Sequence, residues 1–195
     1  MEGFKEIKGN LIHETAVINW DVVEIGEGNK IYPFATIGFD AVHIREKSEG
    51  VVKIGNNNVF REYCCVNKPT AISKMTQIGS NNYLMMYSYI AHDCIVEDNA
   101  TISNAVQLGG HCRIMKNANL GFGCMVHQFQ VIGSFSMVGM GTVVTKKSEI
   151  LPGNTYVGSP ARYLKKNAIA LSRNNVDETM LESEINRYYK LKGSH

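Results

Sequence analysis

Apolar residues recur every six positions along most of the chain. From Ile54 to Ile150, every sixth residue is Ile, Leu, Val or Phe, which makes seventeen consecutive positions in one register. Two shorter blocks with the same six-residue spacing precede this run: Ile25, Ile31 and Ile37, and before them Ile12 with Ile18, which sit one residue out of step with Ile25. A period of six fits neither the 3.6-residue repeat of a helix nor the alternation of a long strand. The pattern predicts short strands separated by turns.

Three such strands close a triangular coil of about eighteen residues, with the apolar residue of each hexad pointing inward. Successive coils then stack at roughly 4.8 Å, the spacing of neighbouring strands. The sequence therefore predicts an all-β protein, a parallel β-helix over residues 1–158. We expect the segment "FDAVHIREKSEG", residues 39–50, to form a charged loop that interrupts the stack.

Glycine often follows the inward apolar residue. It does so at Gly55, Gly79, Gly109, Gly121, Gly133 and Gly139. Because glycine tolerates backbone angles that other residues avoid, we expect tight corners with unusual angles at these positions.

The six-residue pattern ends near Gly158. Asp177 is a plausible helix cap, and apolar residues follow at helical spacing: Met180, Leu181, Ile185, Tyr188 and Tyr189. Residues 159–195 are therefore expected to form a short helical extension that covers one end of the prism. Residues 161–195 contain seven basic and four acidic residues. This excess fits either a solvated helix face or a docking patch for an acidic carrier protein.

Composition narrows the class of protein. Twenty basic and eighteen acidic residues leave a net charge of +2, which favours neither nucleic acid nor a membrane surface as a partner. Five cysteines without a CxxC motif favour reduced thiols in the cytoplasm. The charged start "MEGFKEIKGN" does not look like a signal peptide, and no apolar run is long enough for a transmembrane segment. We expect a cytoplasmic protein.

Histidines gather on neighbouring coils. With eighteen residues per coil, His92, Gly110 and Gln128 share one column, and His111 and His127 lie one position to either side. Two coils span roughly 10 Å, so these residues can line one elongated groove. A single histidine would favour a structural role, but this cluster favours chemistry.

The dipeptide His92–Asp93 suits proton transfer. An imidazole can take a proton from a hydroxyl or an amine at neutral pH, and a carboxylate can fix its tautomer. Adjacent residues of a straight strand point to opposite faces, so the pair can act together only at a corner. A zinc site is the main rival interpretation, but the histidines lack close HxxxH spacing. We predict no metal and no permanently bound cofactor.

The repeats "IGEGNK", "IGNNNVF" and "IGSNNYL" resemble those of hexapeptide-repeat acyltransferases. That resemblance implies left-handed coils and homotrimers with active sites between subunits. The motifs "IAHDC", "GGHC" and "VHQF" are more specific, and over about residues 25–190 the chain resembles the UDP-N-acetylglucosamine O-acyltransferases of lipid A synthesis. Members of this family transfer a 3-hydroxyacyl group from acyl carrier protein to the sugar nucleotide. The donor implied for this chain is acyl carrier protein or coenzyme A.

The resemblance also implies roles for individual residues. His92 would be the general base, Asp93 its orienting partner, and the amide of Gly110 an oxyanion donor. The implied substrate-binding residues are His111, His127, Gln128, Asn67, Asn167 and Arg173. Met140 lies where the family limits acyl length, which implies a short acyl group. An ordinary packing role for Met140 remains the alternative.

Departures from the family concern the acceptor. The family's Gln-Asp nucleotide-binding pair is missing from "FDAVHIREKSEG", Asn67 and Tyr89 replace histidines, and Ile169 replaces an acidic residue. Relative to the family, we expect the chain to lack about one amino-terminal coil and the last part of the helical domain. The segment "GSPARYL" resembles the junction between the last coil and the carboxy-terminal tail of sugar acetyltransferases. Two alternatives therefore stay open: an N-acyltransferase acting on a sugar nucleotide for surface polysaccharide, and a non-catalytic β-helix scaffold.

Overall fold

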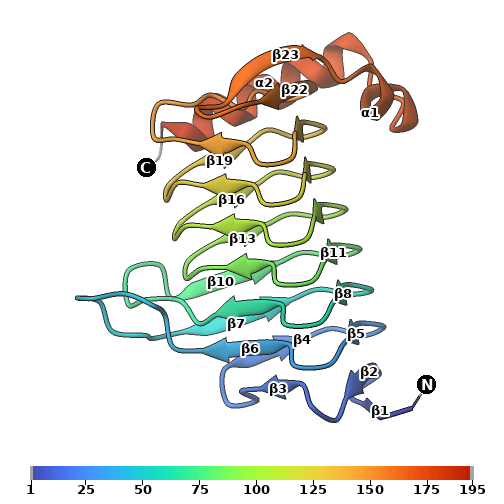
Figure 1. Ribbon diagram of the computed structural model, residues 1–195, viewed down its shortest axis with the longest axis vertical. Coiled ribbons are helices and arrows are strands. Elements are labelled where there is room, and N and C mark those ends of the chain that lie inside the picture. Colours follow the sequence, from blue (N-terminus) through green and yellow to red (C-terminus); the bar gives the residue numbers. More distant parts are fainter. Residues whose placement is uncertain (1, 194–195) are drawn as a thin grey trace.

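The computed structural model describes residues 2–193 and shows a three-sided stack of short strands with helices at one end (Figure 1). The last two residues of the predicted extension lie outside the described residues. The first sheet runs in the order β1 (Phe4–Ile7), β2 (Asn10–His13), β5 (Lys30–Ile31), β8 (Val59–Phe60), β11 (Tyr83–Leu84), β14 (Thr101–Ile102), β17 (Asn119–Leu120), β20 (Met137–Val138), β22 (Asn154–Val157) and β23 (Arg162–Lys166).

Two further sheets complete the prism. The second sheet contains β4 (Val23–Ile25), β7 (Val51–Ile54), β10 (Met75–Ile78), β13 (Ile95–Val96), β16 (Arg113–Ile114) and β19 (Val131–Ile132). The third contains β3 (Val17–Ile18), β6 (Thr36–Phe39), β9 (Cys65–Asn67), β12 (Tyr89–Ile90), β15 (Gln107–Leu108), β18 (Met125–Val126) and β21 (Val143–Val144).

Apart from the antiparallel pairs β1–β2 and β22–β23, strands pair in parallel with the equivalent strand of the next coil. From β10 onward the register advances by eighteen residues. Tyr89 pairs with Gln107, and Gln107 pairs with Met125. Residues of the hexad register such as Leu84, Ile102 and Leu120 are fully buried along the axis. The predicted parallel β-helix is confirmed.

One position of the apolar register is wrong. Ile72 is 63% exposed and lies in a loop. Strand β7 pairs with β10 in a register of 24 residues, with Ile54 opposite Ile78, so this coil carries six extra residues. Because six inserted residues equal one full period, the apolar positions before and after the insertion stay in phase. For this reason Ile72 was counted as an inward position although it lies in the inserted loop.

The expected backbone angles at the glycines after the apolar positions are also wrong. None of these six glycines has a positive φ; the left-handed corner positions are occupied instead by residues such as Asn81, Asp93 and Asn117. The glycines are needed because backbone from the next coil passes close by. A Cβ atom at Gly109 would lie 2.6 Å from the Gln128 nitrogen, and one at Gly121 would lie 2.8 Å from the Met140 nitrogen.

Two loops project from the same edge of the prism (Figure 1). The first, residues 40–50, is the predicted interruption, and the second, residues 68–74, contains the six-residue insertion. They are joined by an isolated antiparallel bridge between Ser48 and Thr70 and by an ion pair between Asp40 and Lys68 at 2.8 Å.

The chain ends in a hairpin and two helices that cover the last coil (Figure 1). Strand β23 pairs antiparallel with β22, so the predicted extension begins with a strand that the sequence did not reveal. Helix α1 (Ala168–Arg173) and helix α2 (Glu178–Lys192) follow. The predicted cap is confirmed, because the Asp177 side chain accepts a hydrogen bond from the Met180 amide at 2.7 Å. No helix within residues 2–193 has the length and apolar character needed to cross a membrane.

Candidate active site

The chain turns sharply at Asp93, between β12 and β13. Asp93 has a φ of 61°, a left-handed conformation that aspartate tolerates better than most residues. Its backbone N–H donates to Oγ1 of Thr76 at 2.9 Å. The corner brings the His92 and Asp93 side chains together, as the prediction required.

His92 and Asp93 form a buried hydrogen-bonded pair. Nδ1 of His92 lies 2.7 Å from Oδ2 of Asp93, and the two residues are only 5% and 6% exposed. Burial raises the pKa of Asp93, but hydrogen bonds from Ser73, His92 and Thr70 outweigh burial and hold it below its ordinary value. An ionised carboxylate only accepts, so Nδ1 of His92 donates in this bond, and in a neutral ring Nε2 is the nitrogen that carries the lone pair. In that tautomer the imidazole presents Nε2 as a proton acceptor.

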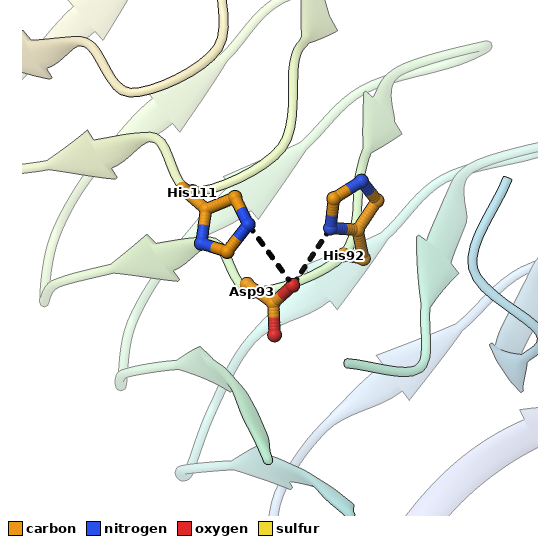
Figure 2. Close-up of side chains that lie close together, drawn as sticks. All are labelled: His92, Asp93 and His111. Atoms are coloured by element: carbon orange, nitrogen blue, oxygen red, sulfur yellow. Dashed lines mark hydrogen bonds and ion pairs between the residues drawn. The ribbon is translucent and has the colours of Figure 1, made fainter. Parts of the chain in front are cut away.

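His111 approaches the same carboxylate from the next coil. Its Nε2 lies 3.4 Å from Oδ2 of Asp93, so one oxygen faces both imidazoles (Figure 2). The rings of His92 and His111 are nearly perpendicular, with centroids 5.3 Å apart. Phe129, one coil further on, stacks on His111 with centroids 4.4 Å apart. The predicted clustering of His92 and His111 is confirmed.

Gly110 faces the His92 ring. A Cβ atom at position 110 would lie 2.4 Å from Cε1 and 2.7 Å from Nε2 of His92. Within the described residues, no group accepts a hydrogen bond from the Gly110 amide. The free N–H and the basic nitrogen therefore belong to the same small region of the site.

A shallow apolar groove of about 420 Å³ begins beside the site on the third sheet. Tyr89, Gln107 and Met125 line it together with His127. His127 also borders a hollow of about 500 Å³ that contains Gln128, Lys146 and Lys192. The structure thus places the predicted residues His127 and Gln128 one coil beyond His111, exposed and next to open space.

Asn67 lies on β9, on the opposite side of the site along the axis. It is 4% exposed, and its Nδ2 donates to the carbonyl of Asp40 at 3.2 Å. Its Oδ1 is buried and has no hydrogen-bond partner among the described residues. A buried orphan acceptor is unusual and suits a position that receives a donor from a ligand.

Three predicted residues are not brought to His92 within one chain. Asn167 caps α1 and donates to the carbonyl of Phe135 at 2.9 Å, and with Arg173 it lines a hollow of about 350 Å³ against the first sheet. Met140 lies on the corner between β20 and β21 and is 75% exposed.

The sequence did not indicate three other residues of the site. Thr70 and Ser73 hydrogen-bond to Asp93 from the second loop, and the ring of His43 meets that of His92 at 5.3 Å from the first loop. The six-residue insertion that contains Thr70 and Ser73 does not disturb the six-residue period, so the sequence pattern did not reveal it. His43 lies in a charged segment without periodicity, so no pattern indicated where its side chain lies.

His92, Asp93 and His111 also offer three potential ligand atoms within 4.8 Å of one another. The two Asp93 oxygens, however, already accept hydrogen bonds from Thr70, Ser73 and His92. These hydrogen bonds stabilise the ionised carboxylate without a metal ion.

The stacked six-residue repeats place the chain in the hexapeptide-repeat class of proteins. Residues 75–110 match the family model described as bacterial transferase hexapeptide (six repeats). The fold is the predicted left-handed parallel β-helix.

Comparison with individual relatives identifies the family more narrowly than the repeat does. The UDP-N-acetylglucosamine acyltransferase structure from Bacteroides fragilis superposes with a TM-score of 0.82 at 31% identity, covering 92% of this chain and 70% of that one. The enzyme from Moraxella catarrhalis gives a TM-score of 0.76 at 25% identity, covering 91% and 82%. The chain belongs to the UDP-N-acetylglucosamine acyltransferase family.

The acyl-(acyl-carrier-protein)–UDP-N-acetylglucosamine O-acyltransferase of Gloeothece citriformis is 38% identical over 169 residues. That alignment covers 86% of this chain and 60% of the relative. The chain therefore spans about three fifths of the length of this curated relative.

Proposed function

We propose that this protein transfers a 3-hydroxyacyl group from acyl carrier protein to a hydroxyl of UDP-N-acetylglucosamine. The observation that carries the proposal is the buried His92–Asp93 pair, whose basic nitrogen faces the Gly110 backbone. The names of the relatives supply the substrates, and the site supplies the chemistry.

In this reaction Nε2 of His92 takes the proton from the sugar hydroxyl as its oxygen attacks the thioester carbonyl. The Asp93 carboxylate stabilises the imidazolium that forms. The Gly110 amide donates to the carbonyl oxygen as it becomes negative. When the C–S bond breaks, the imidazolium returns the proton to the departing thiolate, which leaves as the carrier thiol.

Substrate binding follows from the surroundings of this pair. The apolar groove along Tyr89, Gln107 and Met125 accepts the acyl chain, and Met140 of a neighbouring subunit limits its length to a short group. His111, His127 and Gln128 hold the substrates beside the base. Asn67 offers its unpaired Oδ1 to a donor group of the sugar nucleotide.

The site is completed by a second copy in a homotrimer, because Asn167, Arg173 and Met140 lie on other faces of the chain. An exposed aromatic stack supports such a contact. Phe34, Tyr63 and Tyr87 stack with centroids 5.0 and 4.9 Å apart, although each is about half exposed. Covering this stack with another subunit would remove apolar surface from water.

The carrier protein docks on the basic end of the molecule. All five residues of β23, including Lys165 and Lys166, are exposed. Their charge complements an acidic carrier. The five free cysteines fit the reducing cytoplasm in which we place the protein.

The Gloeothece citriformis and Moraxella catarrhalis relatives are named O-acyltransferases, so N-acylation and a non-catalytic scaffold are not favoured. The test is to incubate the protein with acyl carrier protein and coenzyme A donors and a panel of UDP- and dTDP-amino sugars. Mass spectrometry and NMR should identify an ester on UDP-N-acetylglucosamine, formed from the carrier donor. An amide product would transfer the proposal to the N-acyltransferase, and no product with any pair would reject an enzymatic role on these substrates.

A further inference from the structure

The Asp93 carboxylate is held by the second loop as well as by His92. Thr70 donates its backbone N–H to Oδ1 at 3.0 Å and its hydroxyl to Oδ2 at 2.7 Å. The Ser73 hydroxyl makes a short contact with Oδ1. With the His92 bond on Oδ2, each carboxylate oxygen accepts two hydrogen bonds, and the side chain is fully buried.

The direction of these bonds is fixed locally. Thr70 Oγ1 accepts from the Ile72 amide at 3.3 Å, which leaves its single proton for Asp93. Ser73 Oγ also lies 3.1 Å from the Met75 carbonyl, and its proton serves the closer acceptor, Asp93. Both hydroxyls are therefore donors to the carboxylate.

The first loop supports the second. Thr70 forms an isolated β-bridge with Ser48. The Glu49 amide donates to the Pro69 carbonyl at 3.0 Å, and the Ala71 amide donates to the Lys47 carbonyl at 3.0 Å. His43 of the same loop meets the His92 ring edge-on. Its Nδ1 accepts from two backbone amides, so the loop backbone also sets the orientation of this ring.

We propose that Thr70 and Ser73 are positioning residues, which fix the rotamer and charge of Asp93 and thereby hold His92 in the tautomer that accepts the substrate proton. This inference rests on the proposed function for its kinetic consequences, and on the geometry alone for the state of the imidazole. It gives the six-residue insertion a role: it carries two donors across one coil to the carboxylate of the next.

The kinetic test uses Thr70→Val and Ser73→Ala with carrier-bound donor and UDP-N-acetylglucosamine. Each should lower kcat about tenfold, the loss expected for a hydrogen bond to a charged group. KM for both substrates should stay within about twofold, because neither hydroxyl binds substrate in this proposal. Thr70→Ser keeps both donors and should keep most of kcat. Ser80→Ala is the control, since its hydroxyl accepts from the Asn56 amide at 3.0 Å and does not contact Asp93.

A second readout is the pH profile. The titratable side chains that face Asp93 are His92 and His111, with the Cys94 thiol next in the chain. Removing the hydroxyl donors leaves burial to raise the Asp93 pKa, so the acidic limb of kcat/KM should move to higher pH in Ser73→Ala and Thr70→Val. A role in folding alone would lower activity equally at all pH values.

A third measurement separates this inference from the proposed function. Nitrogen-15 NMR of the His92 ring reports its tautomer without any substrate. The wild-type ring should show the Nδ1–H form, and the Thr70→Val/Ser73→Ala double variant a mixture of tautomers. An unchanged His92 spectrum, an unchanged kcat, a rise in KM alone, or an equal loss in Ser80→Ala would each overturn the positioning role. Wild-type protein that shows the Nδ1–H form but no transfer would instead reject the proposed function.

Discussion

Gly110 and His92 are so close that position 110 cannot carry a side chain without moving the imidazole. The nearest ring atom, Cε1, would lie 2.4 Å from a Cβ at position 110. The glycine thus has a steric role that is separate from any hydrogen bond its amide makes to substrate.

Gly110→Ala should therefore lower kcat by at least about 100-fold, since a displacement of about 1 Å in the reacting geometry costs that much. The protein should still fold, because the backbone at position 110 does not need a positive φ. Steady-state kinetics and circular dichroism test this. Gly193→Ala, which has room for a methyl group at the end of α2, is the control. Activity within tenfold of wild type would contradict the assigned geometry.

Replacing the base has a different signature. His92→Ala should reduce transfer by about 100-fold to 10,000-fold, the contribution expected of general base catalysis, and should leave the assembly intact. Size-exclusion chromatography checks the assembly and a radiolabelled-product assay checks the rate. Near-normal turnover would remove His92 from the mechanism.

The sequence predicted much of this arrangement because a β-helix converts spacing directly into position. Once the coil length was eighteen, His92 and His111 had to lie on neighbouring coils, and the structure shows this register. The second loop could not be predicted from this period, because its six added residues leave Ile78 in phase with Ile54. The sequence analysis therefore missed Thr70 and Ser73, which lie in that loop.

Side-chain contacts between loops follow from no repeat. His43 reaches His92 because the two loops pair at Ser48 and Thr70, a contact that no local pattern encodes. Contributions from a second subunit are likewise beyond the periodicity of one chain. The role of Asn167 and Arg173 in binding the nucleotide sugar came from the family resemblance, and it remains a prediction.

Met140 should limit the acyl chain. Met140→Gly removes a side chain that is 75% exposed in the single chain, and should shift preference toward longer donors. Each additional buried methylene is worth about 0.8 kcal/mol, which corresponds to about fourfold in kcat/KM. Competition between donors of different length, followed by mass spectrometry, measures this shift. Met180→Gly, at an exposed position on α2, should leave the donor profile unchanged; so would Met140→Gly if the residue only packs.

The basic residues of strand β23 should recognise the acyl carrier protein. Charge reversal at Lys165 and Lys166 should raise KM for carrier-bound donors about tenfold at low salt, and this loss should diminish as salt screens the charges. Coenzyme A donors should be less affected, because they lack the acidic protein surface. An equal effect on both donors would indicate destabilisation of the hairpin instead.

Helix α2 should make stability depend on pH through Glu184. Burial raises the pKa of this carboxyl, but hydrogen bonds from Lys116 and Ser134 and the nearby Arg187 together lower it below its ordinary value of 4.5. A lowered folded-state pKa stabilises the protein above the ordinary value, and that stabilisation is lost as pH falls through the folded-state pKa. Glu184→Gln should therefore reduce the free energy of unfolding by about 1–2 kcal/mol at pH 7, and the deficit should shrink below about pH 4.

Urea unfolding at both pH values measures this difference in the free energy of unfolding. Glu182→Gln, exposed on the same helix and outside every ion pair of the described residues, should change stability little at either pH. A deficit of equal size at both pH values would show that the Glu184 charge does not hold the helix on the prism.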